Sequence, residues 1–397
     1  MNTDDIRKAI EKSSNYWEQR ALENKLNIIE NEDDYVRRLT AIYEKANKDI
    51  DDKLAKIYAR YAKENKLTLE EAYRILPKKM ETEYKRDVMD YIEKAKSGDT
   101  KWKQYLLNQS IMHKHSVLDQ LRTEIRNVVY NIDMETTGGQ FLEKIYANSN
   151  YYAQYSNNEE NFARVDTDRV KRLLEEDWSG GNNFSSTIWK NKEQLVQALD
   201  DIVVRGLAVG ESYDKMAERL AKRMGTATTA AKRLIRTESA RMDNVGLLDY
   251  YKKSGVTHLE FVATLDMRTS DICRAMDGEL IPIEKAQVGL NVPPLHPYCR
   301  SVIAPVYADD LEDDRLSKEK RAYRDKDTNK TQVGEYKNYV EYLAKHLGNT
   351  QQANTLASTK NGIRQLTGAI TIIGANPGYE AAYPCKVFWW IVLKIQK

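Results

Sequence analysis

The chain has 397 residues, which is long enough for two or three domains with a well-buried core. Its 62 basic and 60 acidic residues leave a net charge of +2, so no global field draws it to nucleic acid or to an anionic membrane. Three cysteines are too few for a disulfide scaffold and indicate folding in a reducing cytoplasm. The N-terminus lacks the apolar core of a signal peptide, and no run approaches the roughly 20 apolar residues of a membrane span. We therefore expect a protein made in the cytoplasm, with no membrane span.

Charged, helix-forming sequence fills residues 1–147. Between residues 33 and 66, apolar side chains recur at spacings of three and four, which places them on one stripe of a helix. They are Leu39, Tyr43, Ala46, Ile50, Leu54, Ile57 and Tyr61. Thr68 and Glu71 have the spacing of a capping box that opens another helix, and a long helix is expected over 100–133.

Two segments interrupt this helical pattern. Residues 136–139 read Thr-Thr-Gly-Gly, which favours a break. Residues 148–161 are rich in Asn, Tyr and Ser and are typical of a hinge or an exposed loop. We therefore assign residues 1–147 to a helical N-terminal region and residues 148–184 to a hinge or linker.

A compact helical segment follows. Its pattern predicts a helix ending at Gly206, a second from Gly210 to Gly225, and a third over 226–248. The third carries a dense group of mixed charges: Arg233, Arg236, Glu238, Arg241 and Asp243. Charge runs of this kind usually form a solvent-exposed ion-pair face, which is our prediction. The alternative is that some of these charges turn inward and brace the segment that follows.

The apolar period then changes from 3.6 to 2, which predicts strands over 256–264 and 301–306. Between them, residues 266–273 are expected to open a turn and a short helix, and Asp277-Gly278 is a turn signal. The fold class that we predict is therefore mainly α, with long N-terminal helices and a small α+β module.

This module carries most of the unusual residues of the chain. Residues 261–307 contain five of the eight prolines, two of the three cysteines and one of the five histidines. Cys273, followed after 22 residues by His296-Pro-Tyr-Cys299, supplies three ligands of the kind zinc prefers. The fourth ligand of a tetrahedral site is open: Asp266, Asp271, Asp277 or water. A C-x-x-C pair, the stronger zinc signal, is absent from the sequence.

Two other roles are open for these residues. A Cys-His pair is the core of a thiol enzyme, which also requires a group that orients the base. In a purely structural role, the cysteines are small buried apolar groups and His296 bonds a backbone carbonyl. Arg268 and Arg300 then pair with Asp266 or Asp277. We favour the structural role.

Three runs in this order, RLIRTESARMDN, TLDMRTSDICRAMDG and NVPPLHPYCRS, resemble the head morphogenesis domain of phage minor head proteins, the phage Mu F-like family. The resemblance assigns residues 185–308 to this domain. Besides Cys273, His296 and Cys299, it places the family motif on Arg236, Thr237, Glu238, Asp266, Arg268, Thr269, Asp277, Gly278, Pro293, Pro294, Pro297 and Arg300.

The resemblance implies a minor capsid protein that acts in head morphogenesis and enters the procapsid in a few copies. The partners it implies are the portal protein, capsid or scaffold proteins, and double-stranded DNA during packaging or ejection. Assembly in the host cytoplasm would precede incorporation into the virion head. The competing class is a zinc- or thiol-dependent enzyme, such as a hydrolase, that uses Cys273, His296 and Cys299.

Residues 309–397 depart from the family and read as a charged linker, a Tyr-rich helix near residues 336–346, and an atypical apolar tail. The tail contains seven consecutive apolar residues, Val387 to Leu393. Because this run is too short to span a bilayer, we expect it to bury against a partner or touch an interface. An altered reading frame in a decaying prophage would also give such a tail.

Overall fold

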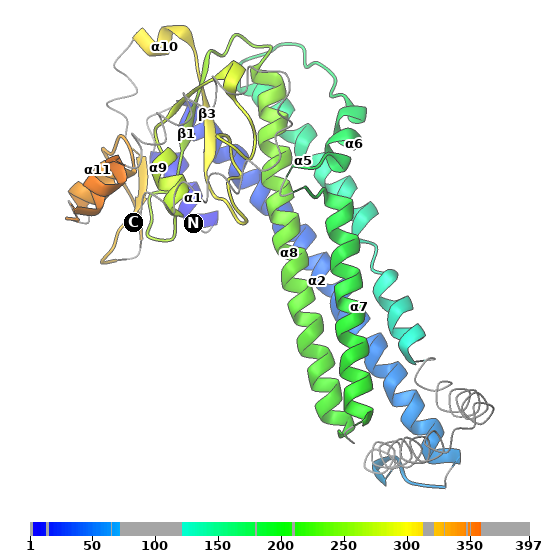
Figure 1. Cartoon of the computed structure of the whole chain (residues 1–397). Coiled ribbons are helices and arrows are strands. Elements are labelled where there is room, and N and C mark those ends of the chain that lie inside the picture. Colours follow the sequence, from blue (N-terminus) through cyan, green and yellow to red (C-terminus); the bar gives the residue numbers. More distant parts are fainter. Residues whose placement is uncertain are drawn as a thin grey trace, which may run out of the picture. The chain divides into compact units, whose positions relative to one another are not determined.

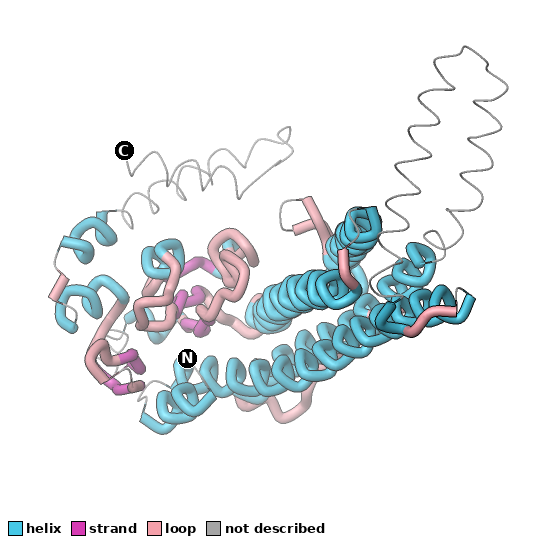
Figure 2. Tube along the Cα trace, turned by 90° about the horizontal axis from the view of Figure 1, so that it is seen from below, coloured by secondary structure: helices cyan, strands magenta, loops and turns pink. Residues whose placement is uncertain are grey.

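The computed structural model describes residues 3–358 except 13–15, 65, 72–120, 179–180, 209–210, 313–320, 329, 347 and 350. Helices dominate the described chain, and its short strands form two small antiparallel sheets (Figure 2). This confirms the predicted class, mainly α with a small α+β module. Within these residues, no helix is long and apolar enough to cross a membrane.

The chain divides into two compact units. The first unit is built from residues 1–35, 138–184 and 233–397, and it contains both sheets. The second is built from residues 36–137 and 185–232, and its described elements are all helices. The domain boundaries expected from the sequence, after residues 147, 184 and 308, stay a prediction.

Helix α2, Tyr16–Glu64, follows the short helix α1, Thr3–Lys12. Five members of its predicted apolar stripe are buried: Leu39, Tyr43, Ala46, Ile50 and Leu54. The side chains of the other two, Ile57 and Tyr61, lie outside the described residues. The spacing of three and four residues therefore identified the buried face of α2.

The predicted capping box at Thr68 and Glu71 is present. The Thr68 backbone N–H donates to Glu71 Oε2 at 2.8 Å, and the Glu71 backbone N–H donates to Thr68 Oγ1 at 3.2 Å. Each side chain thus satisfies one of the N–H groups that the start of a helix leaves unpaired. The helix expected over 100–133 is described only from residue 121, and residues 121–130 are helical.

Helices α5, Met134–Ser156, and α6, Thr167–Glu175, occupy the segment in which we expected a break and a hinge. The predicted break is wrong, because Gly138 lies inside α5. A Cβ there would come within 2.7 Å of the Phe184 ring, so this glycine serves close packing. The predicted loop over 148–161 is also wrong as far as the end of α5, because one side of that stretch is buried, with Ala153 at 0% exposure.

Helices α7, Phe184–Ala208, and α8, Tyr213–Tyr251, replace the three helices predicted from glycine positions. α7 ends close to the predicted Gly206, and α8 begins close to the predicted Gly210. Gly225 does not end a helix, and the two segments on either side of it form one continuous helix. A single interior glycine costs only about 1 kcal/mol relative to alanine, which the packing of a long helix outweighs.

The larger sheet has the order β2-β1-β3 with antiparallel pairing throughout. Its strands are β1, His258–Val262, β2, Leu280–Pro282, and β3, Val302–Val306. Both predicted strands are thus confirmed, with shorter bounds. The predicted short helix is α9, Asp271–Met276, and Gly278 has a φ of +71°, as the turn signal required. One face of β1 and β3 shares a core with α9 and the end of α8, whereas Val262, Val302 and Ala304 form a separate small cluster.

The C-terminal part contributes more regular structure than the sequence predicted. Its elements are α10, Ala308–Glu312, β4, Arg321–Arg324, β5, Thr331–Gly334, α11, Tyr339–Glu341, and η3, Tyr342–His346. Between β2 and β3 there is also a short 3-10 turn, η1, Ile283–Lys285. Tyr323, Tyr339 and Tyr342 join the core of the first unit, so this segment packs as part of that unit. The tail from Val387 to Leu393 lies outside the described residues.

Candidate functional site

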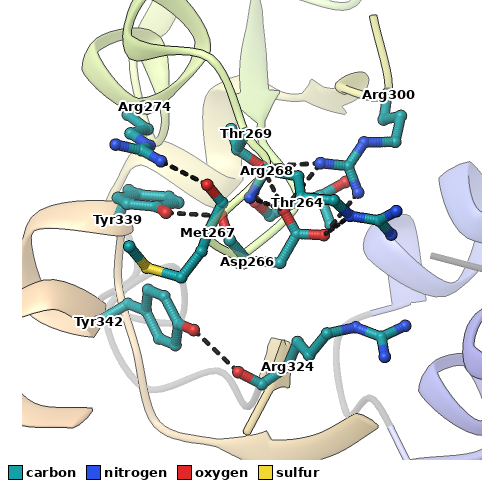
Figure 3. A network of polar contacts seen from close by, with 10 residues as sticks. All are labelled: Thr264, Asp266, Met267, Arg268, Thr269, Arg274, Arg300, Arg324, Tyr339 and Tyr342. Carbon is teal, nitrogen blue, oxygen red and sulfur yellow. Dashed lines mark hydrogen bonds and ion pairs between the residues drawn. The ribbon is translucent and has the colours of Figure 1, made fainter. Parts of the chain in front are cut away.

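Asp266 organises the loop between β1 and α9. Its Oδ1 accepts from the backbone N–H of Arg268 at 3.0 Å and from Thr269 Oγ1 at 3.1 Å, which closes the loop into a tight turn. Arg300 donates to both carboxylate oxygens, at 2.6 and 2.7 Å, from the segment just before β3 (Figure 3). The Arg268 side chain is 72% exposed and comes no closer to this carboxylate than 4.0 Å. Of the two predicted arginine partners, Arg300 therefore forms the strong, bidentate pair.

The environment of Asp266 favours its charged form. Burial alone would raise its pKa, since the side chain is 2% exposed. The hydrogen bonds and the charge of Arg300 outweigh that effect and lower the pKa of Asp266 to about 2. The pair thus holds the loop before α9 against the segment that carries Cys299.

Cys273, His296 and Cys299 come together beside this pair. Cys273 Sγ lies 3.3 Å from His296 Nε2 and 3.6 Å from Cys299 Sγ. The three possible ligand atoms all lie within 4.8 Å of one another. Both cysteines are buried, at 1% and 5% exposure, and both are free thiols. The spacing in the sequence therefore predicted a real cluster.

Two local structures position the cluster. Cys273 lies in the first turn of α9, where the side chain of the N-cap residue Ser270 accepts a hydrogen bond from its backbone N–H. His296 and Cys299 are the ends of a four-residue turn, closed by a bond from the Cys299 N–H to the His296 carbonyl at 3.2 Å. Pro297 is the second residue of this turn and Tyr298, with a φ of +60°, is the third, as a type II turn requires.

A pocket of about 470 Å³ opens next to the cluster. Its lining is mostly polar: Thr264, Arg268, Thr269, Ser270, Cys273, His296, Pro297, Tyr298, Arg300 and Ser301. Among these described lining residues there is no aspartate or glutamate. The pocket therefore offers hydroxyl groups and positive charge, but no carboxylate that could act as a general base.

The electrostatics of the cluster separate the two thiols. The hydrogen bond with Cys299, together with burial, raises the pKa of Cys273. Hydrogen bonding from Cys273 and the nearby His296 lower the pKa of Cys299, and contact with Cys299 raises the pKa of His296. Cys273 is therefore buried and held as a thiol, which is the opposite of an activated nucleophile. Cys299 has the more stable thiolate.

The prediction of a solvent-exposed charge face on α8 is wrong for three of its members. Glu238, Arg241 and Asp243 are only 4%, 2% and 3% exposed. Trp178 Nε1 donates to Glu238 Oε1 at 3.0 Å, and Arg241 Nη1 donates to the Leu173 carbonyl at 2.6 Å. Burial raises the pKa of both carboxylates. These charges turn inward: Glu238 and Arg241 tie α8 to Trp178 and α6, and Asp243 accepts from Asn24 Nδ2 of α2 at 2.7 Å.

The two other motif positions on α8 lie nearer the surface. Arg236 is half-buried and pairs with Asp33 at 2.8 Å, a contact between α8 and α2 within the first unit. The Thr237 hydroxyl donates to the Arg233 carbonyl one turn earlier in the same helix. Neither residue is part of the cysteine cluster.

Asp277 is fully buried, and its partner is one that the sequence analysis did not identify. Arg321 of β4 donates to its two carboxylate oxygens, at 2.9 Å each, and the Ala263 N–H donates to Oδ1 at 2.6 Å. Asp277 is therefore fully occupied and is not a ligand of the cluster. Pro293 and Pro294, joined by a cis peptide bond, lie in the loop before the His296 turn.

Tyr339 of α11 was also missed. Its hydroxyl donates to the Asp266 carbonyl at 2.6 Å, and Arg274 lies over its ring (Figure 3). Both Tyr339 and Arg321 follow the segment in which the cysteines concentrate. A charged or tyrosine-rich stretch gives no sequence signal for a long-range polar contact of this kind.

Comparison with known proteins places these residues in a family. Residues 197–304 match the family described as phage Mu protein F like protein. The chain is also 23% identical over 260 residues to the minor head protein GP7 of Bacillus phage SPP1, an alignment that covers 64% of this chain and 77% of the relative. No solved structure matches. The matched segment contains α8, β1, β2, the start of β3, Asp266 and the cysteine cluster, so these elements form a Mu F-like domain, and the chain is similar to a phage minor head protein.

Proposed function

We propose that the protein acts in phage head morphogenesis as a component of the head present in a few copies, bound to the portal and the inner capsid surface. In this proposal it is made in the host cytoplasm and enters the assembling head with the capsid and scaffold proteins. The observation that carries the proposal is the extent of the similarity to a minor head protein. That similarity spans 260 residues, so it extends well beyond the matched domain of residues 197–304.

Two features of the structure support a binding role over a catalytic one. Helix α2, with 49 residues, buries its apolar stripe within the chain and exposes a long polar face that a neighbouring protein can contact. The polar residues of the Mu F-like domain are mostly engaged with one another, as Asp266 is with Arg300 and Asp277 with Arg321. Both features are typical of a protein that binds other proteins in an assembly.

The experiment is co-assembly. The chain is expressed with the portal and capsid proteins of the same phage genome, and heads are purified and analysed by quantitative mass spectrometry. We expect the chain at a small fraction of the capsid copy number. We also expect it to co-purify with the portal protein when the capsid protein is not expressed. Heads that lack the chain, together with separate elution of chain and portal, would overturn the proposal.

A role on DNA during packaging or ejection makes a separate prediction. Binding to double-stranded DNA would weaken with salt, because neutralised phosphates release counterions. Filter binding at about 50 mM and about 200 mM salt measures this dependence, over which a protein with several phosphate contacts loses affinity by orders of magnitude. Absence of binding at the lower salt would remove DNA from the proposal and leave the portal role intact.

The alternative function is an enzyme that uses Cys273 and His296. The 3.3 Å separation of Cys273 Sγ and His296 Nε2 is the observation in its favour, since a nucleophile and its base lie at about this distance. The burial of Cys273 and the raised pKa of its thiol count against it. A thiol-directed reagent that modifies Cys273 in the folded protein faster than free cysteine would favour the enzyme.

A further inference from the structure

We propose that Cys273, His296 and Cys299 bind one zinc ion, and that the fourth position of that ion faces the adjacent pocket and is taken by water. The first support is the spacing of the ligand atoms. On a tetrahedral zinc with bonds of about 2.3 Å to sulfur and about 2.0 Å to nitrogen, two sulfurs lie about 3.8 Å apart and a sulfur and a nitrogen about 3.5 Å. The corresponding distances here are 3.6 Å between the sulfurs and 3.3 Å between Cys273 Sγ and His296 Nε2.

The second support is the orientation of the imidazole. His296 Nδ1 lies 2.8 Å from the Pro297 carbonyl oxygen, to which its N–H donates a hydrogen bond when Nδ1 carries the proton. That tautomer leaves the lone pair of Nε2 directed toward the sulfurs. Zinc-bound histidines almost always have such a hydrogen bond on the other ring nitrogen, which fixes the ring in place.

The third support is the rigidity of the two segments that carry the ligands. Cys273 is fixed in α9, and the turn from His296 to Cys299 holds its two ligands at its ends. The bidentate pair of Asp266 and Arg300 joins the loop before α9 to the residue after Cys299. The ligand geometry is thus formed by contacts that do not involve the sulfurs.

The identity of the fourth ligand follows from what surrounds the cluster. Asp266 and Asp277 are each occupied by an arginine, and the side chain of Asp271 is 81% exposed and bonded to Arg274. The group of possible ligands among the described residues accordingly has three members. Cys273 and His296 line the pocket of about 470 Å³, so water has access to the open position. Two thiolates and one imidazole select zinc over harder cations such as magnesium or calcium.

Such an ion would link α9 to the segment that precedes β3 (Figure 1). The pocket lining lacks a carboxylate among its described residues, so the ion has no general base beside its water. Whatever binds at its open fourth position, the ion would cross-link two segments of the Mu F-like domain. The inference does not depend on which partner the protein binds in the head.

The first test is the zinc content of the full chain, purified without a histidine tag and measured by elemental analysis. We expect about one zinc per chain, which is the stoichiometry of a single site. Cys299→Ser and His296→Ala should each lower it at least tenfold. Cys385→Ser removes the third cysteine of the chain, which is not one of the proposed ligands, and should leave the zinc content unchanged. Equal zinc in Cys299→Ser and Cys385→Ser would overturn the proposal.

The second test uses the unaltered chain, because a variant that fails to fold would also lose metal. Zinc is removed by chelation and Co²⁺ is added. We expect intense ligand-field absorption of tetrahedral cobalt and a thiolate-to-cobalt charge-transfer band, both reaching a plateau at one equivalent and reversed by Zn²⁺. The proposal would be overturned if the folded protein showed neither band. In that case the two cysteines of the cluster would still react as free thiols or would have formed a disulfide.

Discussion

The buried pair of Asp277 and Arg321 allows a sharp test of what holds the first unit together. Arg321→Met keeps an unbranched side chain of similar length and removes the charge. Asp277, at 0% exposure, would then lose both arginine bonds of 2.9 Å and would keep the bond from the Ala263 N–H, which donates at 2.6 Å. Breaking a buried ion pair by removing one partner costs about 3–5 kcal/mol, because the remaining charge is left uncompensated.

Arg321 has additional partners that place its loss toward the upper end of that range. It donates to the carbonyl oxygens of Ala263 at 3.0 Å and Lys337 at 3.2 Å. We therefore expect the free energy of unfolding to fall by about 4–5 kcal/mol. Urea unfolding followed by circular dichroism measures it, with the denaturant slope compared between variants to show that the same transition is observed.

Two further variants show whether the loss comes from the uncompensated charge. Arg233→Met removes an exposed arginine of the same unit and should change the free energy of unfolding by less than about 0.5 kcal/mol. Adding Asp277→Asn to Arg321→Met removes the charge while keeping an acceptor for the Ala263 N–H, and should recover more than half of the loss. A loss below about 1 kcal/mol for Arg321→Met alone, or no recovery in the double variant, would refute the reasoning.

Three other predictions follow from single residues. Asp266→Asn should lower the free energy of unfolding by about 2–3 kcal/mol near neutral pH, because the pKa of Asp266 in the folded protein is about 2, below its ordinary value of 3.8. The advantage of the wild type over the variant should disappear as the pH falls from about 4 to about 2, which unfolding experiments across that range would detect. Glu32→Gln should raise the free energy of unfolding by up to about 3 kcal/mol at about pH 8 and leave it unchanged at about pH 4.5. Burial raises the pKa of Glu32 to about 7, so the stabilising contribution of Glu32 is complete below its ordinary pKa and is lost as the pH rises through 7. Equal stability of the two proteins at pH 8 would contradict this. Gly246→Ala should destabilise the protein by about 1–3 kcal/mol, since the new Cβ would lie 2.6 Å from the Tyr146 carbonyl oxygen. Gly225→Ala, whose Cβ would have nothing within 4 Å, should stabilise its helix by up to about 1 kcal/mol. Thermal unfolding that ranks the two variants in the opposite order would show that packing at Gly246 is unimportant.

Periodicity predicted the local structure of the chain well where one face of an element is buried. The stripe from Leu39 to Leu54 and the strands around β1 and β3 follow directly from spacings of three to four and of two. Glycine was an uneven guide. Gly206 lies close to a helix end and Gly278 lies in a turn, but Gly138 and Gly225 lie inside helices. A glycine that ends a helix and one inside a helix look alike in one sequence.

The cysteine cluster was predictable in its members and not in its surroundings. The single Cys and the H-x-x-C turn are visible in the sequence as possible metal ligands. The proline-rich segment and the abrupt change in apolar spacing mark where in the chain they lie. The partners of the acidic residues were not predictable, since a carboxylate that binds an arginine and one that binds a metal have the same sequence. Asp277 was a possible fourth ligand until Arg321, 44 residues later in the chain, proved to occupy it.

The structure also indicates that the folded Mu F-like domain extends beyond the segment that matches the family. The matched family segment stops at residue 304, yet Arg321 neutralises the buried Asp277 and Tyr339 bonds the loop of Asp266. A chain that ended with the matched segment would lack the arginine that pairs with the buried Asp277, at a cost comparable to that of Arg321→Met. The hairpin of β4 and β5 and the tyrosines after it, which read as a charged linker and an isolated helix, are therefore part of the domain that holds the cysteine cluster in place.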